Sequence, residues 1–563
     1  MRYNFTETKN WNKGVDVLFL ETDHSRFLKR ILHFVLLLSL FLGTKGYAQQ
    51  NIIKLIPQPA DIQVFAGLVK IQKATNIFVD PRSGVNKTYA EELFQEIGIQ
   101  PVWVTREKNA MIVLKITNPK HGYTEESYHL KVSLKGRNKI TVSSSGKNGL
   151  LHALQTIRQL AINSGQYTTF PVCTINDQPA FGWRAFMLDE SRHFHGKSVV
   201  KKLLDEMARL KLNTFHWHLV DDPAWRMEIK KYPLLTEISS KGDWTHMNKN
   251  IRPAKWDSLY NKRQGQYYTQ EEIREIVAYA DVRGIRVIPE IEVPGHASAS
   301  IYAYPWLGAS SRQKNAGIIG DLYDVTDSKV EKFLQDVLDE VISLFPGGII
   351  HIGGDEADYT HWKESKEINV FMNSNNIPTY ADLQIWTINR MSKYISSKGY
   401  RMIGWNEITG DNIRNDANIE AGKSEKLAKG TLVQFWDGDV SLVNKAIEKG
   451  YDVVNSDRMH TYLDYPYEMT SFEKAYSFNP IPNGVSPENK HKILGLGCQM
   501  WGEFTPTPER LYFQTFPRIA AFAETGWVAP EKKTSYLDFR GRLANIEEIW
   551  KLKGYVKDQA TKY

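Results

Sequence analysis

Two acidic side chains, Asp355 and Glu356, stand next to each other after an apolar run, residues 348–352, and two glycines, Gly353 and Gly354. Neighbouring side chains on an extended strand point to opposite sides, so both carboxyl groups reach one ligand only if the backbone turns. The glycines provide the freedom for that turn and let a ligand approach the backbone closely. Paired carboxyl groups that reach one ligand are candidates for general acid–base chemistry.

Other polar and aromatic residues follow further apolar runs in the same way. They are residues 189–193, then His216, His218, Asp221 and Asp222, then residues 289–296, and later Trp405, Glu407, Trp436, Asp437, Trp501 and Glu503. Each of these groups alone carries little information. Their number suggests that the runs before them are strands that end at one common place.

Eight strand-like runs alternate with helical patterns from about residue 179 onward. The expected strands are 184–188, 214–218, 286–291, 348–352, 401–405, 432–436, 452–455 and 494–499, and the expected helices include 198–210, 270–283, 328–344, 380–398 and 507–525. Eight such units predict an α/β fold, a (β/α)₈ barrel. The active site of such a barrel lies at the carboxyl ends of its strands. A barrel with a purely structural role has no reason to direct so many carboxylates and tryptophans to that mouth, and we expect a carbohydrate site there.

Residues 49–178 show a different pattern. Strand-like runs at 76–79, 110–116, 128–133 and 139–143 are accompanied by helical patterns at 87–97 and 149–161, the second with leucines at helical spacing. They predict a smaller α+β domain, a mixed sheet with helices on one face. The motifs above lie outside it, so we interpret it as a companion to a catalytic barrel of residues 179–550, with a short tail at 551–563.

Residues 1–48 have the order of a secretion signal. Basic residues precede a short apolar run, which is followed by small residues: Arg26, Lys29 and Arg30, then 31–42, then Gly46 and Ala48. The run is shorter than the roughly 20 residues of a membrane-spanning helix, and no cysteine follows it to carry a lipid anchor. We expect cleavage after Ala48 and export to the periplasm or the medium, with no membrane anchor afterwards.

Charge and cysteine content restrict the other possibilities. The formal net charge is +7 over 563 residues, and no dense basic run with interleaved aromatics argues for nucleic acid. The two cysteines, Cys173 and Cys498, lack metal-ligand spacing and could either pair or stay reduced. His216, His218 and His351 are expected to be residues of the barrel interior rather than ligands, so we predict no metal and no cofactor. The oligomeric state stays open.

At the acidic pair the sequence resembles a known family. Residues 351–356 match the His-x-Gly-Gly-Asp-Glu signature of glycoside hydrolase family 20, the β-N-acetylhexosaminidases. Further similar motifs are residues 184–189, 215–218 with 221–222, 289–296, 462–464 and 501–503. The resemblance extends over about residues 54–530 and includes the small preceding domain. Pro223 stands where the family usually has Gln, which we expect to reshape that loop while the neighbouring carboxylates are retained.

The resemblance implies an exo-acting, retaining glycosidase that removes terminal β-linked N-acetylhexosamine and uses the substrate's own acetamido oxygen as the nucleophile. Glu356 would be the general acid and then the base, Asp355 would hold the acetamido N–H, and Tyr462 would donate to the acetamido oxygen. The other implied residues wall the pocket (Trp405, Trp436, Trp501), bind sugar hydroxyls (Arg184, Asp464, Glu503) and support Glu356 (Asp221, His296).

Two other functions are compatible with a sugar-binding barrel. A chitinase-like endo-hydrolase would carry Asp-x-x-Asp-x-Glu after the fourth strand, whereas here the two acids are adjacent. A non-catalytic sugar-binding barrel would lack the acid, whereas Glu356 is present. The natural glycan stays open, as does the preference between gluco and galacto forms.

Overall fold

The computed structural model describes residues 53–118, 122, 124–247, 264–309, 320–411, 413 and 427–556. The expected signal segment, residues 1–48, lies outside them, as does the end of the expected tail. Apart from Ile53, all the described residues belong to one compact unit, which begins at Lys54. Among them, no helix is both long and apolar enough to cross a membrane.

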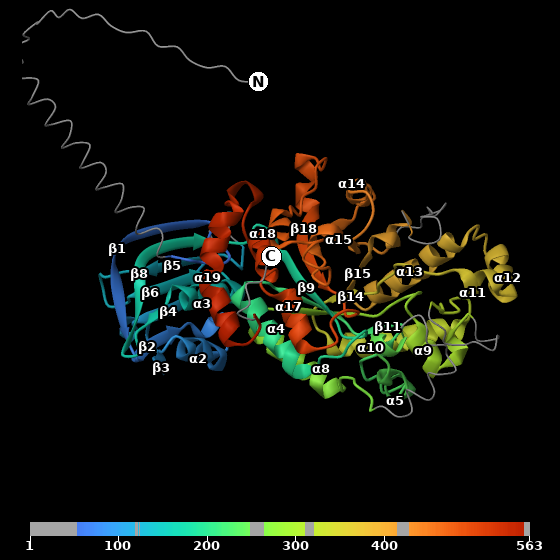
Figure 1. The fold of residues 1–563 in the computed structure, drawn as a ribbon, viewed down its shortest axis with the longest axis horizontal. Coiled ribbons are helices and arrows are strands. Elements are labelled where there is room, and N and C mark those ends of the chain that lie inside the picture. Colours follow the sequence, from blue (N-terminus) through green and yellow to red (C-terminus); the bar gives the residue numbers. More distant parts are fainter. Residues whose placement is uncertain are drawn as a thin grey trace, which may run out of the picture. The chain divides into compact units, whose positions relative to one another are not determined.

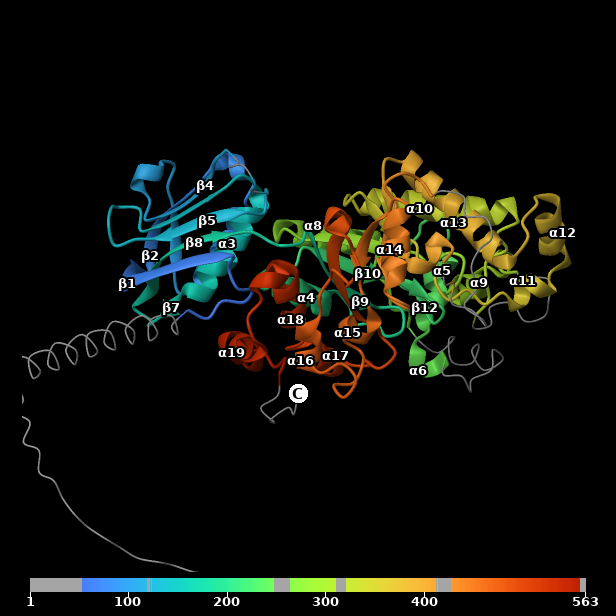
Figure 2. The same cartoon turned by 90° about the horizontal axis from the view of Figure 1, so that it is seen from above.

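Eight parallel strands close into a barrel, in chain order, with the last strand pairing with the first (Figures 1 and 2). They are β9 (Trp183–Asp189), β10 (Thr214–His218), β13 (Arg286–Glu290), β14 (Ile349–His351), β15 (Arg401–Trp405), β16 (Leu432–Phe435), β17 (Asp452–Asn455) and β18 (Ile493–Met500). All eight coincide with the strand-like runs of the sequence, and the prediction of a (β/α)₈ barrel is confirmed. Parallel strands are buried on both faces, which explains why they stand out as apolar runs.

Helices surround the barrel, and four of the five predicted ones agree closely with α4 (Lys197–Arg209), α8 (Gln270–Val282), α10 (Ser328–Leu344) and α13 (Tyr380–Ser397). The predicted single helix over 507–525 is wrong. It is two helices, α17 (Pro508–Thr515) and α18 (Ile519–Trp527), because Pro517 has no amide hydrogen and keeps Phe516 out of the helical region. A further helix, α19 (Tyr536–Leu552), follows without having been predicted.

The preceding domain is a mixed sheet in the order β1-β8-β5-β6-β4-β2-β3, with β7 (Ile162–Asn163) beside β8. The main strands are β1 (Asp61–Gln72), β2 (Ala74–Val79), β3 (Gln100–Trp103), β4 (Ile112–Ile116), β5 (Tyr128–Val132), β6 (Ile140–Ser144) and β8 (Tyr167–Asp177). Pairing is antiparallel from β1 to β6 and parallel from β6 to β3. Helices α2 (Lys87–Glu96) and α3 (Lys147–Leu160), both labelled in Figure 1, pack on each other and on this sheet, so the predicted α+β domain is confirmed.

The mixed sheet meets the barrel at the amino ends of the barrel strands. Arg184, the second residue of β9, pairs with Glu126, and Lys211, just before β10, lies 3.0 Å from the Asp177 carboxylate at the end of β8. The Trp527 indole also donates to Asp177, at 2.9 Å. The companion domain therefore supports the end of the barrel opposite the mouth.

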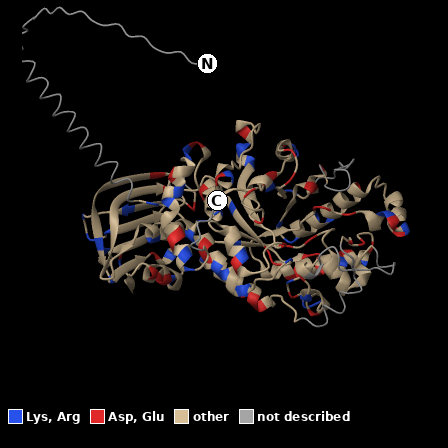
Figure 3. Cartoon of the chain, in the orientation of Figure 1, with Lys and Arg blue, Asp and Glu red and all other residues tan. Residues whose placement is uncertain are grey.

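Two smaller observations complete the fold. Both cysteines are free and buried, Cys173 on β8 and Cys498 on β18, so the alternative of a disulfide between them is excluded in this structure. Acidic and basic residues are interspersed along both parts of the chain (Figure 3).

Candidate active site

The backbone turns sharply after β14, and this turn carries the acidic pair. Gly353 and Gly354 have φ values of 63° and 92°, and Glu356 has 46°, all in the left-handed region. A Cβ atom on Gly353 would lie 1.7 Å from a carboxylate oxygen of Glu292, so no larger residue fits there. As a result the Asp355 residue is buried, at 6% exposure, whereas the Glu356 side chain is 42% exposed.

One imidazole connects the acidic pair to a second pair of carboxylates. His296 Nδ1 lies 3.2 Å from Asp221 Oδ1 and 3.3 Å from Asp222 Oδ2. Its Nε2 lies 3.7 Å from Asp355 Oδ2 and 4.0 Å from Glu356 Oε2. Burial opposes protonation of His296, but Asp221 and Asp222 outweigh it and raise the pKa of His296 well above its usual value. A protonated imidazole thus faces both acids, and Asp221 is linked to Glu356 through it. That Asp221 and His296 support Glu356 stays a prediction.

The unusual Pro223 lies in a tight hairpin and does not disturb these contacts. It follows Asp222 in the two-residue turn between β11 (Val220–Asp221) and β12 (Ala224–Trp225), which pair antiparallel. Asp222 Oδ1 accepts from the Ser298 hydroxyl and amide, while Oδ2 faces His296. The carboxylates before Pro223 are therefore held firmly.

Aromatic side chains form one wall beside the acids. The ring pairs Trp405–Trp436 and Trp405–Trp501 have centroid separations of 6.3 and 5.9 Å, and Tyr462 is stacked on Trp436 at 6.3 Å and 11°. The Trp405 indole donates to Glu290 and the Trp436 indole to Glu407, each at 2.9 Å. Hydrogen bonds fix two of the rings, so the wall is a preformed apolar surface of the kind that packs on a sugar ring and a methyl group.

The prediction that Arg184 binds sugar hydroxyls is wrong. Arg184 lies at the amino end of β9, is fully buried, and donates to the Glu126 carboxylate, to Phe181 O at 2.7 Å and to Lys211 O at 2.9 Å. These contacts belong to the junction with the companion domain, at the wrong end of the strand for ligand binding.

Arg192 is the arginine that lies at the mouth. Its guanidinium is 2.6 Å from Asp221 Oδ2, 3.2 Å from Asp189 Oδ2 and 5.1 Å from the centre of the Trp501 ring. Its Nε is 4.0 Å from Glu503 Oε1. The sequence did contain a signal for Arg192, since it stands three residues after the carboxyl end of β9, among the polar residues 189–193.

Two further carboxyl groups have acceptor atoms with no partner in the described part of the chain. They are Asp464 Oδ1 and Glu503 Oε2, both buried atoms. Burial raises the pKa of Asp464 well above its usual value, with Glu503 adding to the effect, and burial also raises the pKa of Glu503. Such groups are costly to bury alone, and they gain partners when a ligand rich in hydroxyl groups enters.

Asp355 has acidic neighbours as well as the imidazole. Burial, opposed by His296 and reinforced by Glu356 and Glu290, raises the pKa of Asp355 to about 7. Two acids that we had assigned no role, Glu292 and Glu407, are also buried with pKa values raised well above the usual range, mainly by burial and then by Asp355. The mouth therefore concentrates carboxyl groups that resist ionisation in the absence of a ligand.

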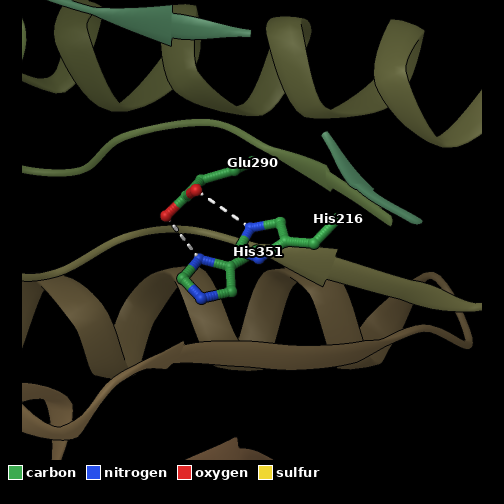
Figure 4. Close-up of side chains that lie close together, drawn as sticks. All are labelled: His216, Glu290 and His351. Atoms are coloured by element: carbon green, nitrogen blue, oxygen red, sulfur yellow. Dashed lines mark ion pairs between the residues drawn. The ribbon is translucent and has the colours of Figure 1, made fainter. Parts of the chain in front are cut away.

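Below the acids, imidazoles surround the buried carboxylate of Glu290 (Figure 4). His216 Nε2 and His351 Nδ1 lie 2.9 and 2.8 Å from its two oxygens. Burial opposes ionisation of Glu290, but His351, His218 and His216 outweigh it and hold the pKa of Glu290 well below its usual range. Ligand atoms of His216, Glu290 and His351 are close enough together to hold a metal ion, as are those of His296, Asp355 and Glu356. That no metal is needed stays a prediction.

Comparison with known proteins gives matches over both parts of the chain. Residues 181–530 match the model of the glycosyl hydrolase family 20 catalytic domain, and residues 53–178 match that of glycosyl hydrolase family 20 domain 2. The two models meet where the mixed sheet gives way to the barrel.

Similar proteins occur in Porphyromonas gingivalis and Vibrio furnissii. A beta-hexosaminidase of Porphyromonas gingivalis is 36% identical over 448 residues, which are 75% of this chain and 53% of that protein, so the match spans about half of the relative. A beta-hexosaminidase of Vibrio furnissii is 33% identical over 494 residues, or 84% of this chain and 76% of that one.

Solved structures are similar too. The GH20 exo beta-N-acetylglucosaminidase of Vibrio harveyi, in complex with N-acetylglucosamine, matches with a TM-score of 0.77 and 29% identity, over 90% of this chain and 78% of that one. The chitobiase of Flavobacterium johnsoniae matches with a TM-score of 0.76 and 34% identity, over 90% and 74% of the two chains.

Proposed function

Since the chain belongs to glycosyl hydrolase family 20, we propose that it is an exo-acting, retaining β-N-acetylhexosaminidase. Its substrate is a glycan that ends in β-linked N-acetylhexosamine. The observation that carries the proposal is the acidic pair, Asp355 and Glu356, on the turn after β14 and next to the wall of Trp405, Trp436, Tyr462 and Trp501. Relatives named beta-hexosaminidase and a similar structure with bound N-acetylglucosamine support the same substrate class.

The exposure of the two acids supports different roles for them. Glu356, with a side chain 42% exposed, is open to the glycosidic oxygen and to water, as a general acid that later becomes the base must be. Asp355 is buried beside His296 and faces the acetamido group instead. Its negative charge accepts the acetamido N–H and stabilises the positive charge of the oxazolinium that forms when the acetamido oxygen attacks the anomeric carbon.

Intramolecular attack fits the remaining residues. Tyr462 donates to the acetamido oxygen and aims it, and the indoles enclose the acetamido methyl. A nucleophile held in this way has a very large effective molarity, up to about 10⁵–10⁸ M in well-oriented cases. Arg192, Asp464 and Glu503 provide one donor group and two acceptors for the hydroxyls of the terminal ring, which favours exo action.

Hydrolysis of aryl glycosides tests the reaction and the nucleophile together. We expect cleavage of nitrophenyl N-acetyl-β-glucosaminide and almost none of nitrophenyl β-glucoside, which lacks the acetamido group. Replacing one to three acetamido hydrogens by fluorine weakens that oxygen as a nucleophile, so the rate should fall steadily along the series. A flat series with a trapped glycosyl-enzyme ester would instead show that a protein carboxylate attacks.

We also propose that the protein is exported and that the mature chain begins at Gln49. The order of basic, apolar and small residues over 26–48 supports this. Mass spectrometry of the native protein should find Gln49 at the amino terminus in the periplasmic or extracellular fraction. Intact residues 1–48 on a cytoplasmic protein would contradict the proposal.

A further inference from the structure

His218, the last residue of β10, lies between the buried Glu290 and the carboxylate of Asp221. Its side chain has no exposed surface; Nδ1 contacts a Glu290 oxygen, and Nε2 lies 2.9 Å from Asp221 Oδ2. We propose that His218 is a positioning residue that fixes Asp221 and, through Asp221, both His296 and Arg192. This inference rests on the proposed function, because it concerns the donation of the proton and the binding of sugar hydroxyls.

Asp221 is the shared support of two different parts of the site. Oδ1 lies 3.2 Å from His296 Nδ1, and the opposite nitrogen of that ring faces Asp355 and Glu356. Oδ2 lies 2.6 Å from Arg192, which reaches towards the wall and the sugar-binding carboxylates. One carboxylate thus orients the imidazole beside the general acid and the guanidinium beside the hydroxyls. If it rotates, both lose a contact and keep only their second carboxylates, Asp222 for His296 and Asp189 for Arg192.

Besides His296, Arg192 and the Asp222 amide, which donates to Oδ1, the Asp221 carboxylate has one more contact. His218 supplies it on the same oxygen as Arg192, from the strand just before the β11–β12 hairpin. Glu290 anchors His218 from the other side, and the Trp405 indole and two more imidazoles in turn fix Glu290. A continuous path of contacts therefore runs from the barrel interior through His218 to the mouth.

The charge of His218 agrees with this arrangement. Charged and titratable groups face it from β9, β10, β13 and the segments that follow them: Asp189, Arg192, His216, Asp221, Glu290 and Glu292. Burial opposes protonation, but Glu290 and Asp221 outweigh it and raise the pKa of His218 well above its usual value. Burial raises the pKa of Asp221, but Arg192, His296 and then His218 outweigh it and hold that pKa far below the usual range, so a cation at His218 adds to the support of the ionised form.

His216 offers a matched control two residues earlier on the same strand. It also contacts Glu290, at 2.9 Å, and is equally buried, but no contact joins it to Asp221 in the described residues. Burial lowers the pKa of His216 to about 4, so it carries no charge near neutral pH. His216→Gln removes an imidazole from Glu290 without removing the support of Asp221.

The experiment compares the wild-type protein with His218→Gln and His216→Gln on nitrophenyl N-acetyl-β-glucosaminide and its 3-deoxy and 4-deoxy analogues. For His218→Gln we expect kcat/KM to fall by about 10²-fold, the scale of a small misplacement of reacting groups. We also expect the alkaline limb of the pH profile of kcat/KM to move to lower pH. A displaced Asp221 carboxylate stabilises the protonated form of His296 less, so the pKa of His296 falls. The deoxy penalty is the factor by which kcat/KM falls when a deoxy analogue replaces the parent substrate. This penalty should be smaller in His218→Gln than in the wild type, because Arg192 loses its alignment.

His216→Gln should keep the wild-type alkaline limb and the wild-type deoxy penalty. The melting temperature shows whether His218→Gln folds. If it does not, Glu290→Gln removes the carboxylate that contacts His218 Nδ1, and we expect the same changes in kcat/KM, alkaline limb and deoxy penalty. A wild-type alkaline limb and deoxy penalty in the folded His218 or Glu290 variant would overturn the inference. So would identical changes in the two histidine variants. Failure of the wild-type protein to hydrolyse the parent substrate would instead refute the proposed function.

Discussion

Replacing Asp355 by Asn should stabilise the ligand-free protein while it impairs activity. The Asp355 residue is 6% exposed, and burial raises its pKa from 3.8 to about 7. Because one pKa unit corresponds to about 1.4 kcal/mol, ionising this carboxyl group costs the folded state on the order of 4 kcal/mol. Asn keeps the shape and removes the charge, so up to that amount of stability is regained where Asp355 would be ionised. This is the trade between stability and activity expected of a site prepared for a ligand.

The sign of the pH dependence follows from linkage. An acid whose pKa is higher in the folded state contributes stability that is complete below its unfolded pKa, about 3.9, and is lost as pH rises through the folded pKa. The stability gain of Asp355→Asn should therefore be absent near pH 4, grow between pH 4 and 7, and be complete at pH 8. At about 2 cal/mol/K per residue, the entropy of unfolding of this chain converts 4 kcal/mol into roughly 4 °C of melting temperature.

Thermal unfolding of wild type and Asp355→Asn in the same buffers, from pH 4 to 8 and without ligand, provides the assay. The difference at pH 4 measures the effect of the amide itself, so only the growth of the difference with pH reports the charge. Glu356→Gln is the matched control, since it makes the same change from acid to amide at the next residue, whose side chain is 42% exposed. A difference that is constant or shrinks with pH would refute the reasoning, as would an equal growth for Glu356→Gln.

Three further expectations follow from the site. Glu356→Gln should lower turnover by about 10²–10⁴-fold for alkyl glycosides but less for nitrophenyl glycosides, which need little protonation; equal losses would give Glu356 another role. Arg192→Gln should lower kcat/KM by about 10–100-fold through lost charge-assisted contacts. Arg184→Gln should instead lower the melting temperature, because it takes the guanidinium away from the buried Glu126 and leaves that carboxylate only His152 and Asn213; the reverse pattern in kinetics and thermal unfolding would restore Arg184 to the site. Activity should survive exhaustive dialysis against EDTA, and a loss that zinc restores would contradict this.

The barrel could be predicted because its strands are buried on both faces and so form apolar runs bounded by polar loops. The long strands β1 and β8 of the companion domain escaped prediction. In β1 most residues are exposed and the pairing is irregular between Val64 and Leu68, so burial does not alternate regularly, and threonines and polar residues interrupt β8. The single helix over 507–525 was wrong because the apolar spacing continues through Pro517 although the helix cannot.

The two arginines show where sequence reasoning about the site fails. Arg184 stands in a recognisable motif, but it lies at the amino end of its strand, whereas Arg192 follows the carboxyl end of the same strand. A strand of seven residues is about 23 Å long, so the position of a residue along the strand decides which end of the barrel it serves. In this fold, residues beyond the carboxyl end are the better candidates for a site, whatever motif they belong to.

The unsatisfied carboxyl groups also explain how such a mouth can select its substrate. Asp355 Oδ1, Asp464 Oδ1 and Glu503 Oε2 are buried atoms without hydrogen-bond donors in the described residues. A terminal N-acetylhexosamine brings the missing donors, an N–H for Asp355 and hydroxyls for the other two. A sugar without the acetamido group leaves Asp355 Oδ1 buried and without a donor. Sites built around a buried polar partner reject ligands that lack it by about 10⁴–10⁵-fold. The charges that weaken the empty protein are therefore the same ones that discriminate against other sugars, and stability regained by Asp355→Asn should appear as lost discrimination between N-acetylglucosaminides and glucosides.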